Sequence, residues 1–533
     1  ANSLSAVWRL FRGFSEEQRR YEKRLILEHP AFAQLCQQLL RDARRLARGD
    51  LVFSLHAVVS LGVPQNTLLV QTLLRMCQEK LNQLDNRCIS VLATALTGLD
   101  KDKNVSALQA GLRLLVEQRI PQIRDISLLQ NMMRCMGKDA PVFLKKKLEK
   151  AVLKELDHLT FLNAQRVFSA LVAMNYCSIP ILNACSEKIL ENIHDVPFRR
   201  LILILQACHD LQYHDIKLFS ALANYVTSTV CLWDKRQILL LLSAFEVLGF
   251  QPAELMDIFA EKVIEDPEFL NLKYLLIILR VYSRLNYVPR SQKQRFIETL
   301  HSCLNKYLPN ISSPELLKAV YSLCILGYLP HPALDQLLRK ENLDELQSDD
   351  LYKDQKETML QCVKACVELD SPSFTKPALV RAEDFSSSAP PNHGKAREAL
   401  LELLGDENMF RENVQLLHNY HIDFEIRVDS ERKKVLPGTA TDDHADSIFP
   451  ALSACRLAFL FVPLSAFCMG TTHPQGKLAV KKRHLTKLGY EVIVVMNKKF
   501  QEMTNEDAVE FLKGKIYSRS AFPFCEVNVQ TNN

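Results

Sequence analysis

The sequence predicts a mainly α-helical protein, an α-solenoid of helical-hairpin repeats of about 38 residues followed by a small C-terminal α/β domain. Three observations support this prediction. A phrase made of an apolar helix, a turn residue and often a nearby proline recurs from residue 50 onward. Only 15 glycines occur in 533 residues, which favours helices over sheets. Two runs rich in β-branched and aromatic residues, 456–462 and 490–496, lie near the C-terminus.

Length and composition limit the classes of protein that fit. A chain of 533 residues is too long for one hydrophobic core, so a repeat array with a further domain is expected. The formal net charge of +5 permits a nucleic-acid partner without requiring one, because a local basic patch matters more than the sum. The 15 cysteines show no CxxC pair or Cys/His metal spacing, so we expect buried free thiols in a reducing compartment and no metal site. No apolar run is long enough for a membrane span.

The first segment, residues 1–49, is expected to form basic helices. Four arginines recur there at helical spacing on one face, namely Arg41, Arg44, Arg45 and Arg48. This face is either an ordinary solvated surface or a landing site for phosphates. The chain begins with alanine rather than methionine, so we expect that a targeting segment was removed or is absent from this sequence.

The repeat array is expected over residues 50–345. Its turn residues follow one another at intervals of 36 to 41 residues, and most suit a left-handed helix cap. They are Gly62, Gly98, Gly137, Asn175, Gln212, Gly249, Asn286 and Gly327. Mostly small residues stand five positions before them, which would let neighbouring helices approach closely. A period in this range with two helices per repeat is typical of an α-solenoid.

One face of the helix before each turn residue carries a recurring set of polar and basic side chains. Positions thirteen, nine, six and two before the turn residue share this face. A repeated polar column with basic ends is typical of the inner wall of a single-strand RNA reader, and an ordinary solvated face would show the same pattern. The predicted RNA-binding cations of the array are Arg124, Arg166, Arg199, Arg200, Arg236, Lys273, Arg280 and Lys318.

Beyond the repeats the composition changes twice. Closing helices are expected over residues 346–370, where Cys362 and Cys366 are predicted to be core residues rather than metal ligands. Residues 371–392 are rich in proline and serine and are predicted to be a linker. A helical segment is expected over residues 393–420.

The α/β domain is expected over residues 421–520, with a tail over 521–533. Strands are predicted at residues 422–428, 456–462 and 490–496. The loop between the first two contains an acidic cluster, residues 442–446, which is predicted to be solvated rather than a metal site.

A helix with a basic face is predicted from about Gly476 to Leu488, ended by Gly489. His484 on this helix is either a base-contacting residue or an ordinary helix-face residue. The predicted RNA-binding cations of the helix are Lys477, Lys481, Lys482 and Arg483.

With these features together, the chain resembles the FAST-kinase-domain family of mitochondrial RNA-binding proteins. The resemblance rests on the repeat, which looks like the octotricopeptide class, on the segment around residues 395–420, and on a terminal RAP domain. The RAP motifs are HIDFEIRV, RLAFLFV and GKLAVKKRHLTKLGYEVIVV. The resemblance implies a mitochondrial matrix location, in RNA granules or near nucleoids. It also implies mitochondrial mRNA or rRNA as partner, possible contacts with other RNA-granule or ribosome-assembly proteins, and no small-molecule substrate or cofactor.

The roles implied by the resemblance are transcript processing, stability, translation or large-subunit ribosome assembly. Kinase chemistry has no support, because the sequence lacks GxGxxG, HRD and DFG. The RAP domain resembles the core of PD-(D/E)xK nucleases, whose chemistry needs two or three acidic metal ligands and a lysine. Asp423 could supply the first acid, with Glu425 beside it and Lys477 or Lys481 as the lysine. The second strand, residues 458–462, offers no carboxylate.

We therefore predict a non-catalytic RNA-contacting cap at the end of a repeat array, without catalytic residues or a bound metal. Asp423 is kept as the residue to test. The alternatives are a metal-dependent RNA endonuclease that uses the RAP domain, and a protein-interaction scaffold.

Overall fold

The computed structural model describes residues 4, 6–7, 10, 16–100, 102–348, 353–371, 393–437 and 454–518. The chain divides into two compact units, residues 1–222 and 223–533, and each is described by itself. Residues 372–392 of the predicted linker, the acidic cluster at 442–446 and the tail at 521–533 lie outside the described residues. Within the described part of the chain, no helix is both long enough and apolar enough to cross a membrane.

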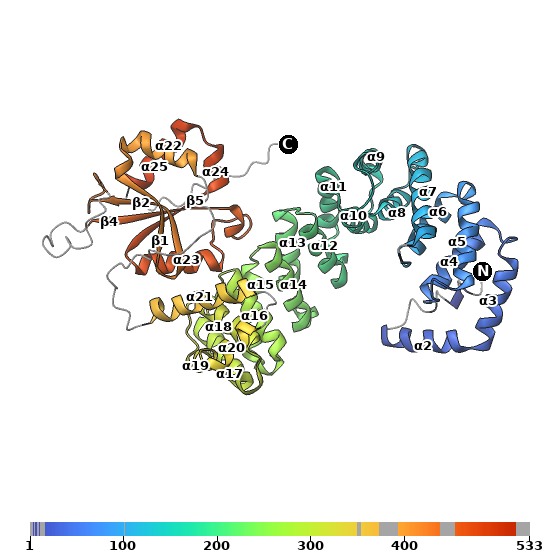
Figure 1. Cartoon of the computed structure of the whole chain (residues 1–533), viewed down its shortest axis with the longest axis horizontal. Helices are drawn as coiled ribbons and strands as arrows, with labels where there is room; N and C mark the ends of the chain where they lie inside the picture. Colours follow the sequence, from blue (N-terminus) through green and yellow to red (C-terminus); the bar gives the residue numbers. More distant parts are fainter. Residues whose placement is uncertain are drawn as a thin grey trace. The chain divides into compact units, whose positions relative to one another are not determined.

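The first unit consists of helices, and from α4 onward they form pairs (Figure 1). The helix before each turn residue packs against the corresponding helix of the next repeat, so that α4, α6, α8, α10 and α12 form a row. A 3₁₀ turn follows the second helix of most pairs. The helices are α2 (Glu16–Glu28), α3 (Pro30–Asp42), α4 (Arg48–Ser60), α5 (Leu68–Glu79), α6 (Asn86–Leu96), α7 (Lys103–Arg119), α8 (Ile126–Met136), α9 (Val142–Lys154), α10 (Phe161–Met174), α11 (Ile179–Glu191), α12 (Phe198–Asp210) and α13 (Ile216–Ser228), which contains the boundary between units.

The turn residues behave as their chemistry predicts at seven of eight positions. Asn175, Gln212 and Asn286 have φ values of 46°, 52° and 50°, and four of the five glycines also have positive φ. This left-handed conformation ends the helix and reverses the chain direction at little steric cost for Gly and Asn. Gly98 is the exception, since its φ is not positive.

The helical part of the second unit continues the same pairing. Here α14, α16 and α18 form a row, and α21 packs on α18 as the next member of that row. The helices are α14 (Lys235–Leu248), α15 (Ala253–Glu265), α16 (Leu272–Arg284), α17 (Lys293–Tyr307), α18 (Ser313–Ile325), α19 (His331–Leu337), α20 (Lys340–Ser348) and α21 (Lys353–Asp370). The predicted α-solenoid with a C-terminal α/β domain is confirmed.

The α/β domain has a sheet between two helical layers (Figure 1). The strand order is β1-β2-β4-β5, with β3 paired to β2; β4 and β5 are parallel and the other pairs are antiparallel. One face packs on α22 and α25 through residues such as Phe424 and Phe459, and the other packs on α23 through Leu460 and Leu485. The elements are α22 (Gly394–Leu404), β1 (Phe410–Leu416), β2 (Tyr420–Val428), β3 (Val435–Leu436), β4 (Cys455–Val462), α23 (Gly476–Lys487), β5 (Tyr490–Met496), α24 (Asn497–Glu502) and α25 (Asn505–Tyr517).

One sequence prediction is wrong in this region. The segment 393–420 was expected to be helical, but α22 ends at Leu404 and Gly405 turns the chain with a φ of 76°. Residues Phe410–Leu416 then form β1, the edge strand beside β2. Their sequence, FRENVQL, has strong helix formers and little β-branching, so pairing with β2 decides their conformation.

Candidate nucleic-acid interface

The polar face predicted on the repeat helices is solvent-accessible in the second unit. On α14 it presents Arg236, Leu240 and Val247, of which Leu240 keeps 53% of its surface exposed. On α16 the same face presents Lys273 and Arg280 to solvent. The face therefore combines cations with exposed aliphatic side chains, a composition that suits phosphates and base or sugar edges together.

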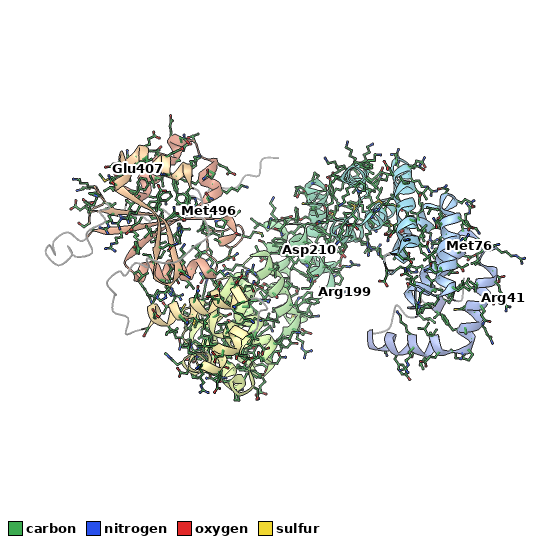
Figure 2. All side chains as sticks on the ribbon, in the orientation of Figure 1. Arg41, Met76, Arg199, Asp210, Glu407 and Met496 are labelled. Atoms are coloured by element: carbon green, nitrogen blue, oxygen red, sulfur yellow. The ribbon has the colours of Figure 1, made fainter. Side chains whose placement is uncertain are left out.

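The predicted cations of the first unit lie on its surface. Arg124, Arg166 and Arg199 are exposed and Arg200 is half-buried. Figure 2 labels Arg199 at the start of α12. Arg124 lies 3.7 Å from the Glu155 carboxylate. Among the described residues, no carboxylate pairs with Arg166, Arg199 or Arg200, so these charges are available to a ligand.

The predicted cations of the second unit's helices differ in how far they are compensated. Lys273 and Lys318 are exposed, and no described carboxylate pairs with either. The Arg236 guanidinium lies 5.9 Å from the ring centre of Tyr274, a cation–π contact between successive repeats.

Arg280 is partly compensated within the protein. It donates to Ser243 Oγ at 2.8 Å and lies 3.3 Å from the buried Glu246 carboxylate, which also pairs with Arg284 at 2.9 Å. The contribution of Arg280 to a phosphate-attracting field is therefore smaller than its exposure suggests.

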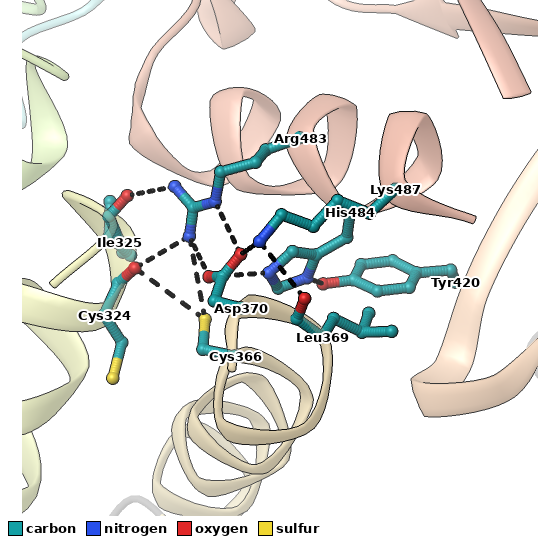
Figure 3. A network of polar contacts seen from close by, with 9 residues as sticks. All are labelled: Cys324, Ile325, Cys366, Leu369, Asp370, Tyr420, Arg483, His484 and Lys487. Carbon is teal, nitrogen blue, oxygen red and sulfur yellow. Dashed lines mark hydrogen bonds and ion pairs between the residues drawn. The ribbon is translucent and has the colours of Figure 1, made fainter. Parts of the chain in front are cut away.

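The four predicted cations of α23 fall into two classes. Lys477 and Lys482 are exposed, and neither pairs with a carboxylate among the described residues. Lys481 is mostly buried within the RAP domain, and Arg483 faces the repeats. Figure 3 shows that Arg483 donates to the Ile325 and Cys324 carbonyls, at 3.0 and 2.9 Å, and to the Asp370 carboxylate at 2.7 Å. Its donors are thus used inside the protein.

Asp370, the last residue of α21, is the centre of this polar network (Figure 3). It accepts hydrogen bonds from Arg483, from Lys487 Nζ at 2.7 Å, and from His484 Nε2 at 3.1 Å. Burial alone would raise the pKa of Asp370, but the hydrogen bonds from His484, Arg483 and Lys487 outweigh it and lower that pKa strongly. The carboxylate is therefore ionised and compensated by cations of α23.

His484 is fully buried, which excludes the base-contacting role considered from the sequence. Its Nδ1 lies 2.5 Å from the Tyr420 hydroxyl, while its Nε2 faces Asp370. The ring therefore links strand β2 to helix α21. Asp370 itself had no sequence signal, because a lone acid at a helix end is common.

Cys366, Asp370 and His484 each place one potential metal-binding atom within 4.8 Å of the others. The surrounding charge does not fit a metal ion. Arg483 Nη2 lies 4.0 Å from Cys366 Sγ, and Arg483 and Lys487 already bind the carboxylate. A metal cation there would face two protein cations, so we interpret the cluster as an ion-pair network.

Asp423, the residue retained for a test of nuclease chemistry, is buried in a second polar cluster. Its Oδ2 accepts the Phe461 N–H at 2.7 Å, and its Oδ1 lies 3.3 Å from His393 Nε2 and 3.5 Å from His421 Nδ1. Burial would raise the pKa of Asp423. The hydrogen bonds from His421 and the Phe461 N–H, together with the charges of His393 and Lys481, outweigh burial and lower that pKa.

The structure therefore places Lys481 near Asp423, the arrangement of acid and lysine that the resemblance to PD-(D/E)xK nucleases implies. Burial lowers the pKa of Lys481, and the charge of Asp423 opposes that shift. Glu425, the neighbouring acid on β2, instead faces Tyr490, whose hydroxyl lies 3.5 Å away. Within the described residues, Asp423 is the one carboxylate in this cluster, so the paired acids of a metal nuclease are not assembled.

Three family models match the chain. The model described as FAST kinase-like protein, subdomain 1, covers residues 275–347, the subdomain 2 model covers 358–437, and the RAP domain model covers 459–515. The Asp370 network joins all three regions, because Cys324, Asp370 and Arg483 fall one in each.

Curated relatives match over the whole chain. FAST kinase domain-containing protein 2, mitochondrial, of Homo sapiens is 45% identical over 535 residues, which cover 100% of this chain and 74% of the relative. The Mus musculus protein of the same name is 43% identical over 530 residues, covering 99% and 76%. FAST kinase domain-containing protein 1, mitochondrial, of Mus musculus is 27% identical over 253 residues, covering 42% and 30%.

Proposed function

Because this chain belongs to the family of mitochondrial FAST kinase domain-containing proteins, we propose that it is a mitochondrial RNA-binding protein that grips single-stranded RNA without catalysing a reaction. The observation that carries the proposal is a set of exposed cations on repeat helices with no carboxylate partner among the described residues. Arg166, Arg199, Lys273 and Lys318 belong to this set. Cations without a carboxylate partner contribute most to the free energy of binding a polyanion, because each can neutralise a phosphate and release the counterions condensed on it.

The chemistry of the repeat surface favours single strands over duplexes. Exposed aliphatic side chains such as Leu240 lie on the same helix face as Arg236. A single strand can turn its bases toward such a surface while its phosphates meet the cations, whereas a duplex hides its bases. We further propose that the RAP domain adds contacts through Lys477 and Lys482, the exposed cations of α23.

The cellular role that we propose is the handling of mitochondrial mRNA or rRNA in the matrix, in RNA granules or near nucleoids. That handling comprises processing, stability, translation or assembly of the large ribosomal subunit, and contacts with other proteins of these assemblies are part of the proposal. Crosslinking of the protein to RNA in cells, followed by sequencing, would identify the transcript. Recovery of proteins but no RNA would favour the scaffold alternative.

Salt-dependent binding to a labelled single-stranded RNA tests the proposal in solution. Lys273→Glu and Lys318→Glu should each weaken binding, and neutral substitutions should flatten the plot of log affinity against log salt by about 0.7 per lost phosphate contact. Lys513→Glu is the matched control, because Lys513 is exposed on α25, which covers the face of the sheet opposite to α23. Equal effects at all three positions would contradict a specific RNA surface.

A metal-dependent endonuclease is the second candidate, and the placement of Lys481, His393 and His421 around Asp423 is the observation in its favour. The single carboxylate of the cluster does not fit the metal-ligand set of the PD-(D/E)xK class, so we derive no catalytic step from it. RNA that stays intact with magnesium or manganese would exclude this candidate. Cleavage by the wild type that Asp423→Ala abolishes would replace our proposal with it.

A further inference from the structure

The C-terminal turns of α14, α16 and α18 present backbone carbonyls to the RAP domain. The Gly249 carbonyl accepts the Met469 N–H at 2.8 Å, the Asn286 carbonyl lies 2.9 Å from His473 Nε2, and the Ile325 carbonyl accepts from Arg483. The last carbonyls of a helix lack partners within the helix and carry partial negative charge. The three turns together therefore form a surface that suits N–H groups and cations.

Asp370 adds a full negative charge to this surface at the end of α21. Its three partners, Arg483, His484 and Lys487, all come from α23, and Lys487 also donates to the Leu369 carbonyl at 3.1 Å. Only 6% of the Asp370 side chain is exposed, so these contacts are weakly screened by water and salt.

The close approach of the backbones fixes the position of α23. A Cβ on Gly476, the first residue of α23, would lie 2.1 Å from the Ser283 carbonyl oxygen and 2.7 Å from Ile325 Cγ2. A Cβ on Gly249 would lie 3.0 Å from Gln475 Nε2. Shape and charge thus place α23 in one register across α16, α18 and α21.

We propose that Asp370 is a positioning residue for RNA binding. It acts through Arg483, His484 and Lys487 to hold the RAP domain on the repeat ends. One RNA can then contact the exposed cations of α23 and the cations of the neighbouring repeat helices at the same time. In this assignment the basic motif of α23 has two functions: Arg483 docks the domain, and Lys482 faces the ligand. The proposal rests on the RNA-binding function proposed above.

The sign of a charge change separates positioning from direct contact. Asp370→Asn removes a negative charge and frees two cations, so an electrostatic contact model predicts equal or tighter RNA binding. The positioning model predicts weaker binding. When the RAP domain is no longer held on the repeat ends, an RNA bound to the repeat helices meets the cations of α23 at a lower effective concentration. We expect a loss of about tenfold to hundredfold for an RNA long enough to span both surfaces, and little change for a short oligonucleotide.

Arg483→Gln and Lys482→Gln are a matched pair of variants, since each removes one positive charge from α23. Amide hydrogen exchange reports docking without RNA, and the informative sites are Met469, which donates to Gly249, and the helix ends around Cys324 and Ile325. Arg483→Gln and Asp370→Asn should accelerate exchange at these sites while α25 stays protected. Lys482→Gln should leave exchange unchanged, weaken RNA binding and lower the salt slope of that binding.

The outcomes separate the two proposals. Accelerated exchange in Asp370→Asn with no RNA binding by the wild type would support the role of Asp370 in docking and refute the RNA function. Unchanged exchange in Asp370→Asn and Arg483→Gln would refute the positioning role, whatever the RNA result. Tighter RNA binding by Asp370→Asn would also refute it and would make Arg483 a direct contact.

Discussion

Gly476→Ala gives the sharpest test of how the RAP domain is held, because a single methyl group is added at the closest backbone approach. The new Cβ would lie 2.1 Å from the Ser283 oxygen, whereas ordinary contact begins near 3.4 Å. Helix α23 would have to move by about 1.3 Å, and a carbonyl at a helix end cannot yield as a flexible side chain does. That shift is large enough to break hydrogen bonds of 2.9 and 3.0 Å from Arg483 to Cys324 and Ile325.

The expected cost combines overpacking with lost hydrogen bonds. Overpacking typically costs about 1–3 kcal/mol. Each hydrogen bond to a charged group contributes about 1.5–3 kcal/mol. The total cost cannot exceed the free energy of docking, because the RAP domain separates from the repeat ends once the strain is larger than that free energy. We expect the docked state to lose about 3 kcal/mol, which is about a hundredfold in the docking equilibrium.

The assay is amide exchange at Met469, together with calorimetric unfolding of the whole chain. Gly514→Ala is the control, because Gly514 lies inside α25 and a Cβ there would meet no described atom within 4 Å. Alanine at that helical position should stabilise α25 by about 0.5–1 kcal/mol. Wild-type exchange in Gly476→Ala would refute the reasoning, since the Cβ would then have found room that the structure does not contain.

Three further predictions concern buried polar groups. Because the pKa of Asp370 is lowered in the folded protein, the ionised carboxylate stabilises the fold fully above the unfolded-state pKa of about 4, and this stabilisation is lost as the pH falls below that value. The difference in unfolding free energy between wild type and Asp370→Asn should therefore be constant from pH 5 to 8 and shrink in acid. A pH-independent difference would contradict this prediction. Asp423→Asn should lower the pKa of Lys481 further, because it removes the charge that opposes desolvation; an NMR titration of Lys481 that shows a rise would contradict the assigned proximity. His484→Phe should keep the packing but remove one hydrogen bond from Asp370, which keeps Arg483 and Lys487, and leave the buried Tyr420 hydroxyl without its partner, at a cost of about 1–3 kcal/mol; denaturant unfolding measures the loss, and wild-type stability would refute the role of the ring.

Some predictions from the sequence hold because they depend on local chemistry. The turn residues were identified from their spacing and from the tolerance of Gly and Asn for positive φ, and seven of the eight adopt it. The strands β2, β4 and β5 were identified because β-branched and aromatic residues cluster there. The edge strand β1 was missed because its residues have no such preference.

The candidate site was harder to predict because exposure and pairing are not local properties. The sequence placed Lys477, Lys482 and Arg483 on one basic helix. It could not show that Arg483 turns toward a carboxylate 113 residues earlier in the chain, while Lys482 remains in solvent. Likewise, nothing in the spacing of Arg280 indicated that Glu246 compensates its charge.

The sequence by itself determined the repeat, the strands β2, β4 and β5 and the family to which the chain belongs, because turn residues, clusters of β-branched and aromatic residues and short motifs are properties of neighbouring residues. The tertiary structure decided which residues of the basic helix are paired inside the protein and which remain in solvent. It brought Asp370 under α23 and placed Gly476 against Ser283. It also left Asp423 without a second carboxylate in its cluster, among the residues described. These outcomes depend on contacts between segments far apart in the chain, and such contacts form only when the α/β domain folds and packs on the ends of the repeats.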